Sequence, residues 1–184
     1  MQQNSSHWVF GYGSLIWRPG FQFIRSVPAL LPGAHRRLCV FSFRHRGTAA
    51  RPGLVFGLVR GGSCRGMAFE VEPERWDEVR DYLREREMDN GVYREARRAI
   101  RLAGGGRAEA LAFLVDEHHP QFAGRLDLFE QVRLVRGGVG ESGTNPEYVL
   151  ETANGLKAIG IRDRYIDELI AALGGMGVAI ATTA

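Results

Sequence analysis

The fold is decided at GMAFEVEPERWDEVRDYLREREM, residues 66–88, where a strand pattern changes into a helical one. Residues 66–71 are mostly apolar, as in a buried strand. Pro73 follows at a position that suits the first turn of a helix. Apolar residues then recur at helical spacing as far as Asn90-Gly91, a pair that ends helices. The stretch therefore predicts a strand that leads directly into an amphipathic helix.

Working outward from this stretch, strand patterns prevail before it and helical patterns prevail toward the C-terminus. Further segments rich in β-branched and aromatic residues are predicted strands at residues 8–10, 37–43, 54–59, 93–100 and 108–115. Further helices are predicted at residues 126–135, 145–158 and 162–173. Strands followed by helices favour an α+β fold with a mixed or barrel-like sheet over a doubly wound one.

Length and composition indicate a single globular domain. A chain of 184 residues can bury one full core, so we expect one domain over residues 1–184, with 174–184 as a flexible tail of small apolar residues. A composition of 45% hydrophobic and 24% charged residues excludes a largely disordered chain. No apolar run approaches the roughly 20 residues of a membrane span, and the N-terminus lacks a signal pattern. We therefore expect a cytoplasmic protein.

Cysteine usage and charge limit the classes of site. Cys39 and Cys64 form no CxxC pair and have no histidine at metal-ligand spacing, so both are expected in the core, and no metal is expected. The net charge of +3 comes from arginine, with Lys157 the one lysine. Such a charge suits an anionic small molecule as well as a nucleic acid.

Glu87 is the carboxylate in the helical stretch that falls on its apolar face. At about 100° per residue from Trp76, Leu83 and Glu87 each lie about 20° away on either side. The other glutamates of the stretch point to the opposite face. A carboxyl group at an apolar position loses hydration, which raises its pKa and suits it to proton transfer. The alternative is that Glu87 pairs with an arginine or reaches water at the helix end.

A glycine-rich turn interrupts the apolar run WVFGYGSLIW, residues 8–17. It does not fit the GxGxxG or P-loop patterns of nucleotide sites, because Ile16 stands at the third glycine position and no lysine follows. It also lacks the flanking glycines of a GxSxG nucleophile elbow. There remain two interpretations: a permissive turn, or backbone amides that converge on a carboxylate or an oxyanion.

Five blocks in order resemble the ChaC family of γ-glutamylcyclotransferases. FGYGSLIW (10–17) is similar to the family's N-terminal signature, and HRG (45–47) with Pro52-Gly53 resembles its second block. The third is Cys64-x-Gly66-x-Ala68, and the fourth is YLREREM (82–88) followed by Tyr93-Arg94. The last is SGTNPEYVLETAN (142–154). The resemblance implies the γ-glutamylcyclotransferase-like fold, a mixed barrel-like sheet with flanking helices.

The resemblance also implies a lyase of glutathione degradation, which releases 5-oxoproline and cysteinylglycine without a cofactor. In this interpretation Glu87 is the acid/base for attack of the substrate's own amine on its γ-carbonyl. The backbone of the loop binds the substrate's α-carboxylate or its oxyanion, and Tyr148 donates its hydroxyl or else packs in the core. The substrate-binding residues expected of the loop are Gly11, Tyr12, Gly13, Ser14, Leu15 and Ile16.

Three other functions compete with this one. One is a non-catalytic regulator, against which the position of Glu87 on the apolar face argues. A relative that acts on other γ-glutamyl amines or dipeptides would differ in the pocket for the leaving group. A basic nucleic-acid-binding module is suggested by the closely spaced arginines 36, 37, 44, 46 and 51. Near-absence of lysine argues against it, and we expect a small-molecule partner and neither a nucleic acid nor a membrane.

Overall fold

The computed structural model describes residues 7–88 and 90–175, which form two compact units. Among these residues the first unit comprises 7–37, 56–88 and 90–122, and the second comprises 38–55 and 123–175. That the whole chain acts as one domain stays a prediction.

A closed barrel of five strands forms the sheet. The strands are β1 (His7–Gly11), β2 (Arg25–Ser42), β3 (Gly53–Val71), β4 (Tyr93–Leu102) and β5 (Arg107–Val115), in the order β1-β3-β2-β4-β5. β1 and β3 are antiparallel, as are β4 and β5, whereas β5 is parallel to both β1 and β3. The predicted α+β class with a mixed, barrel-like sheet is therefore confirmed.

Two strands extend far beyond their predicted ranges. The strands expected at residues 54–59 and 66–71 are both parts of β3, and β2 begins at Arg25 instead of residue 37. Glycines at positive φ explain the difference: Gly33 has φ +85°, and Gly61 and Gly62 have φ +94° and +68°. Such residues let a strand bend without ending, but in sequence they resemble strand breaks.

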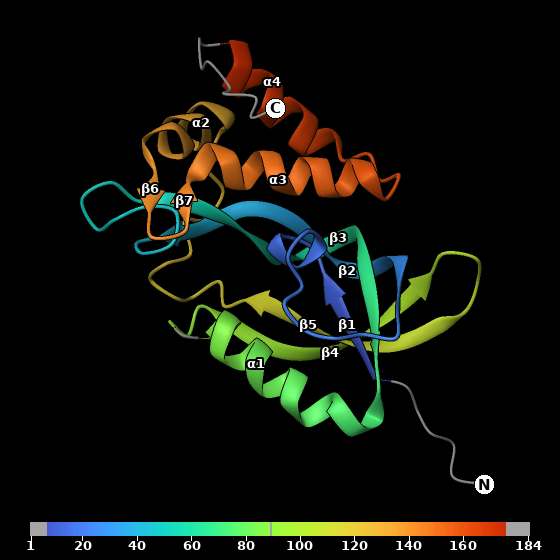
Figure 1. The fold of residues 1–184 in the computed structure, drawn as a ribbon. Coiled ribbons are helices and arrows are strands. Elements are labelled where there is room, and N and C mark those ends of the chain that lie inside the picture. Colours follow the sequence, from blue (N-terminus) through green and yellow to red (C-terminus); the bar gives the residue numbers. More distant parts are fainter. Residues whose placement is uncertain (1–6, 89, 176–184) are drawn as a thin grey trace, which may run out of the picture. The chain divides into compact units, whose positions relative to one another are not determined.

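The helix α1 (Trp76–Met88) follows β3 through a 3₁₀ turn at Pro73–Arg75. It lies beside β4 within the first unit (Figure 1). Its buried residues are Trp76, Val79 and Leu83, which confirms the predicted apolar face. Burial of that face holds the helix to the barrel, and the same face carries Glu87 one residue before the helix ends.

Three helices and a short hairpin make up most of the second unit. They are α2 (Leu128–Gly137), β6 (Val139–Gly140), β7 (Gly143–Thr144), α3 (Asn145–Ala158) and α4 (Arg164–Gly175). The bounds predicted for α3 are confirmed, and α2 and α4 each begin and end two residues later than predicted. Gly174 and Gly175 end α4, while the rest of the predicted tail lies outside the described residues.

Gly66 lies where β3 passes the end of β1, and it leaves no room for a side chain. A Cβ there would lie 2.3 Å from the Gly11 carbonyl oxygen and 2.9 Å from the Phe10 ring. We expect Gly66→Ala to lower the free energy of unfolding by about 2 kcal/mol, the usual cost of overpacking. Urea denaturation measures this loss. Gly137→Ala, at an open position, is the control, and equal stability of the two variants would contradict the prediction.

Candidate active site

The glycine loop begins where β1 ends and closes as one 3₁₀ turn. Gly11 is the last residue of β1, and the turn spans Ser14–Ile16. The Ile16 amide donates to the Gly13 carbonyl at 3.0 Å, so this amide closes the turn itself. The amides at the start of such a turn have no carbonyl partner within it. Of the backbone amides predicted to converge on an anion, that of Ile16 is therefore already bonded, and those of the preceding residues stay candidates. The side chain of Leu15 is buried, so Leu15 can offer a ligand only its backbone.

Arg36 fixes the backbone of this loop from β2. Its Nε donates to the Tyr12 carbonyl, and its Nη2 donates to the Arg65 carbonyl at 2.6 Å. The side chains of Arg36 and Tyr12 are both buried within the first unit. A guanidinium bound to two carbonyls at once holds the loop against β3 in one orientation.

Glu87 lies near the end of the apolar face of α1, and only 16% of its side chain is exposed. Burial raises the pKa of this carboxyl group above its ordinary value, and the positive charge of Arg86 partly opposes the rise. The prediction of a partly desolvated carboxylate at the helix end is confirmed. The alternative pairing with an arginine also holds, because Arg86 Nε lies 3.4 Å from Glu87 Oε1.

Arg86 joins the Glu87 end of α1 to the glycine loop. Its Nη2 donates to Ser14 Oγ at 2.9 Å, and its Nη1 donates to the carbonyl of Arg18 at 2.7 Å. The geometric prediction that the loop and Glu87 lie together has this support within the first unit: a single guanidinium contacts both. Such a site offers a carboxylate for proton transfer beside backbone donors for an anion.

Tyr148 belongs to the second unit, where it lies buried on α3. The Arg46 guanidinium lies 5.4 Å from the centre of its ring. Arg46 Nη1 also donates to the Thr144 carbonyl at 3.0 Å and lies 3.5 Å from Glu147 Oε2. Tyr148 is therefore buried, as the alternative of a core position predicts, and its role as a hydroxyl donor to a ligand stays a prediction.

The basic segment at residues 44–46 is occupied by contacts of its own unit. Arg44 is exposed and pairs with Glu141 at 2.9 Å, and His45 Nδ1 lies 3.0 Å from Ser142 Oγ. These pairs favour the structural interpretation of Arg44 over a role in binding a substrate carboxylate.

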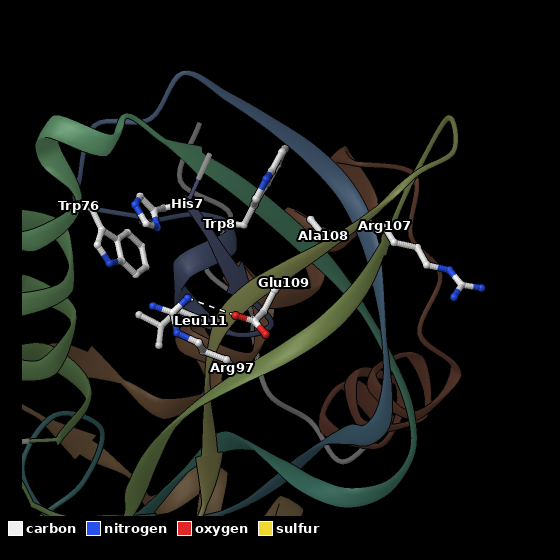
Figure 2. Close-up of a pocket in the computed structure, with 8 residues that line it drawn as sticks. All are labelled: His7, Trp8, Trp76, Arg97, Arg107, Ala108, Glu109 and Leu111. Atoms are coloured by element: carbon white, nitrogen blue, oxygen red, sulfur yellow. Dashed lines mark hydrogen bonds and ion pairs between the residues drawn. The ribbon is translucent and has the colours of Figure 1, made fainter. Parts of the chain in front are cut away.

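A separate cavity of about 420 Å³ lies at the other end of α1, beside Trp76 (Figure 2). His7 stacks on Trp76 with ring centres 4.5 Å apart, and Arg97 pairs with Glu109 at 3.2 Å. Burial and the charge of Arg97 lower the pKa of His7. The cavity includes no predicted site residue, and Trp76 and Glu87 stand at opposite ends of the helix.

The described residues were also compared with the requirements of a metal site, a disulfide and a membrane-spanning helix. Among the described residues, no group of His, Cys, Asp or Glu side chains is arranged to hold a metal ion. Neither Cys39 nor Cys64 takes part in a disulfide in this part of the chain, and both are buried as expected. Within the same residues, no helix is both long and apolar enough to cross a membrane.

Comparison with known proteins identifies the family. Residues 7–175 match the family model described as ChaC-like protein. The chain belongs to the ChaC family. A glutathione-specific γ-glutamylcyclotransferase of Escherichia coli (strain K12) is 31% identical over 163 residues, which cover 89% of this chain and 71% of that protein. The protein of the same name from Schizosaccharomyces pombe is 32% identical over 179 residues, covering 85% and 86% of the two chains.

A solved structure supports the fold expected of a ChaC protein. The crystal structure of a γ-glutamylcyclotransferase specific to glutathione from yeast has a TM-score of 0.86 at 24% identity. The match covers 94% of this chain and 97% of the yeast chain. The predicted γ-glutamylcyclotransferase-like fold is confirmed.

Sequence reasoning missed two arginines that organise the loop of this ChaC protein. Arg36 was grouped with nearby arginines as a charged segment, although it is buried and binds the Tyr12 carbonyl. The sequence offers Arg86 only as one of the arginines that could pair with Glu87. Its place directly before Glu87 in the fourth ChaC block was the available signal, but the sequence does not indicate which carbonyls a guanidinium will reach.

The raised pKa of Glu87 predicts a pH-dependent cost to the stability of this ChaC protein. The folded state binds the proton more tightly than the unfolded chain does, because the folded pKa lies above the ordinary value of 4.5. The contribution of Glu87 to the free energy of unfolding therefore falls as pH rises from about 4.5 through the folded pKa, and it is constant above it.

We expect Glu87→Gln, which cannot ionise, to be more stable than the parent at pH 7.5. The difference should disappear near pH 4, where the parent carboxyl group is protonated in both states. Urea denaturation at the two pH values measures this. Glu85→Gln, an exposed position on the same helix, is the matched control. A Glu87→Gln difference that does not change with pH would contradict the expectation.

Proposed function

We propose that this protein is a glutathione-specific γ-glutamylcyclotransferase, a lyase that converts glutathione into 5-oxoproline and cysteinylglycine. The observation that carries the proposal is the pairing of a half-buried carboxyl group of raised pKa, Glu87, with a glycine loop that shares the Arg86 guanidinium. The names of the E. coli and S. pombe relatives support the choice of substrate.

In the proposed reaction Glu87 moves one proton between two nitrogen atoms of the substrate. The carboxylate takes a proton from the α-amino group, whose lone pair attacks the γ-carbonyl carbon and forms the C–N bond of the five-membered ring. The tetrahedral intermediate then collapses, the γ-amide C–N bond breaks, and Glu87 returns the proton to the leaving cysteinyl nitrogen. Burial raises the pKa of this carboxyl group toward the pH at which the enzyme works, so the group can both accept the proton and release it.

The glycine loop supplies the anion site of the proposed reaction. The amides of Gly13, Ser14 and Leu15 precede the one that closes the turn, and they are our candidates for donors to the substrate's α-carboxylate or to the oxyanion at the γ-carbon. Gly11 contributes by its lack of a side chain, since a Cβ there would lie 3.0 Å from the Leu15 Cβ and from the Phe69 ring. The Ser14 hydroxyl accepts a bond from Arg86, which argues for a structural part and against a nucleophile.

Tyr148 is proposed as a hydroxyl donor to the substrate, as the sequence predicted. Its ring lies against the Arg46 guanidinium within the second unit, and this contact holds the side chain in place. The proposal for Tyr148 is tested separately from that for Glu87, by the effect of Tyr148→Phe on KM for glutathione. A cytoplasmic location, expected from the sequence, is part of the same proposal.

The assay that tests the function follows both products in water enriched in ¹⁸O. Purified protein incubated with glutathione should release equal amounts of unlabelled 5-oxoproline and cysteinylglycine, because ring closure consumes no water. A hydrolase would instead form labelled glutamate. A panel of γ-glutamyl amines and dipeptides separates the glutathione-specific enzyme from a broader cyclotransferase. The absence of 5-oxoproline with every substrate would overturn the proposal.

Buried arginines weaken the alternative of a nucleic-acid-binding module. Arg36 and Arg46, two of the five arginines that suggested it, are buried in their own units and bound to backbone carbonyls. A buried guanidinium that already has acceptors is not available to phosphate groups. An affinity for oligonucleotides that falls steeply with salt would be the observation that restores this alternative.

A further inference from the structure

All three guanidinium nitrogens of Arg86 make polar contacts near the end of α1. Its Nη1 donates to the carbonyls of Arg18 and Pro19 at 2.7 and 3.1 Å and to the Tyr82 hydroxyl at 2.9 Å. Its Nη2 donates to Ser14 Oγ at 2.9 Å, and only 20% of its side chain is exposed. These bonds tie the last turn of α1 to the chain that follows the glycine loop.

The same guanidinium also contacts the proposed base. Arg86 Nε lies 3.4 Å from Glu87 Oε1, so the charge that binds the loop also faces the carboxylate. A guanidinium presents five donors in a rigid plane, and a movement of the plane would disturb both sets of contacts together. Lysine has the charge but cannot reproduce this fork of donors.

Gly20 and Tyr82 keep the guanidinium in its place. Gly20 has φ +76°, and a Cβ there would lie 2.0 Å from the Tyr82 hydroxyl oxygen. Only a residue without a side chain lets Tyr82 stand close enough to accept from Arg86. The local backbone is therefore adapted to this arginine.

We propose that Arg86 is a positioning residue, which sets the position of the Ser14–Pro19 segment relative to the Glu87 carboxylate while the γ-glutamyl group reacts. This inference rests on the proposed function and adds a residue to it. Ring closure needs the amine, the base and the anion donors in register, and a displacement of about 1 Å can cost about 100-fold in rate. In this proposal Arg86 acts through its contacts with Glu87 and the loop.

A pH–rate profile reports the pKa of Glu87, which depends on the charged and titratable groups near its carboxylate. Arg86 contacts the carboxylate and lowers its pKa against the effect of burial. The Tyr82 hydroxyl contacts Arg86. Arg84 lies on the exposed side of α1, where it pairs with Glu95 of β4. Removal of the Arg86 charge should therefore raise the pKa of Glu87, whereas removal of the Arg84 charge should not.

The test compares Arg86→Gln, Arg86→Lys and Tyr82→Phe with the matched control Arg84→Gln. We expect Arg86→Gln to lose about 100-fold in kcat with a smaller change in KM. The rising limb of its pH–rate profile should move to higher pH. Arg86→Lys should keep the parent limb and still lose about 10-fold in kcat, because it lacks the fork. Tyr82→Phe should lose a few-fold without a shift of the limb, and Arg84→Gln should stay within about two-fold of the parent.

Hydrogen exchange gives a readout that does not depend on turnover. The amides of residues 14–19 should exchange faster in Arg86→Gln than in Arg84→Gln at equal global stability. If the parent releases no 5-oxoproline, the proposed function fails and exchange alone judges the positioning role. Parent kcat in Arg86→Lys, an unshifted limb in Arg86→Gln, or unchanged exchange would each overturn the inference.

Discussion

Glu87→Gln should lower kcat for glutathione about 1,000-fold, a loss within the range that general acid–base groups contribute. Glutamine has nearly the same shape as glutamate, so it keeps the packing of residue 87 on the apolar face of α1 and removes only the ability to carry a proton. KM should change little, because the carboxylate acts in the transfer step more than in binding. Steady-state kinetics with quantified 5-oxoproline measure the loss.

Glu85→Gln supplies the control for this result, since it makes the same chemical change two residues away on the exposed side of the helix. It should retain the parent kcat. Glu87→Gln should also remain folded, and at neutral pH it should be the more stable protein. Turnover at more than a tenth of the parent rate in folded Glu87→Gln would remove Glu87 from the mechanism and leave the fold assignment standing.

Asn145→Ala should cause the largest loss of stability among the substitutions considered, about 3 kcal/mol in the free energy of unfolding. Asn145 is fully buried in the second unit, and its amide group pairs with both backbone groups of Leu54. Its Oδ1 accepts from the Leu54 amide at 2.6 Å, and its Nδ2 donates to the Leu54 carbonyl at 2.7 Å. Alanine leaves two buried backbone groups without a partner, at about 1–3 kcal/mol each.

Urea denaturation measures this loss, with Asn154→Ala, an exposed asparagine on the same helix, as the control. Asn145→Asp keeps the shape of the side chain but cannot donate to the Leu54 carbonyl when ionised. We expect it to be destabilised to a similar extent. An aspartate variant with the stability of the parent would show that shape, and not the pair of hydrogen bonds, accounts for the role of Asn145.

Periodic burial was the part of the fold that the sequence could predict. The face of α1 formed by Trp76, Val79 and Leu83 follows from helical spacing, and so does the position of Glu87 beside it. The long strands were harder because their bends contain glycine and proline. Gly61 and Gly62 both have positive φ inside β3, and such residues look like loops when only the sequence is read.

The candidate site was predictable in its residue types but not in its contacts. Helical spacing predicts that Glu87 lies on the apolar face, and the two glycines within an apolar run single out the glycine loop. The roles of Arg36 and Arg86 depend on which backbone carbonyls lie within reach, and only the folded chain determines that. The same holds for Asn145, whose partner Leu54 is 91 residues away in sequence.

The bond from Arg36 to the Tyr12 carbonyl has a consequence for the electrostatics of the proposed reaction. A trans peptide group is planar, so a carbonyl turned toward Arg36 directs the N–H of Gly13 to the opposite side. This dipole is therefore oriented before any substrate arrives. A donor that is already aligned requires no reorganisation energy when negative charge develops in front of it.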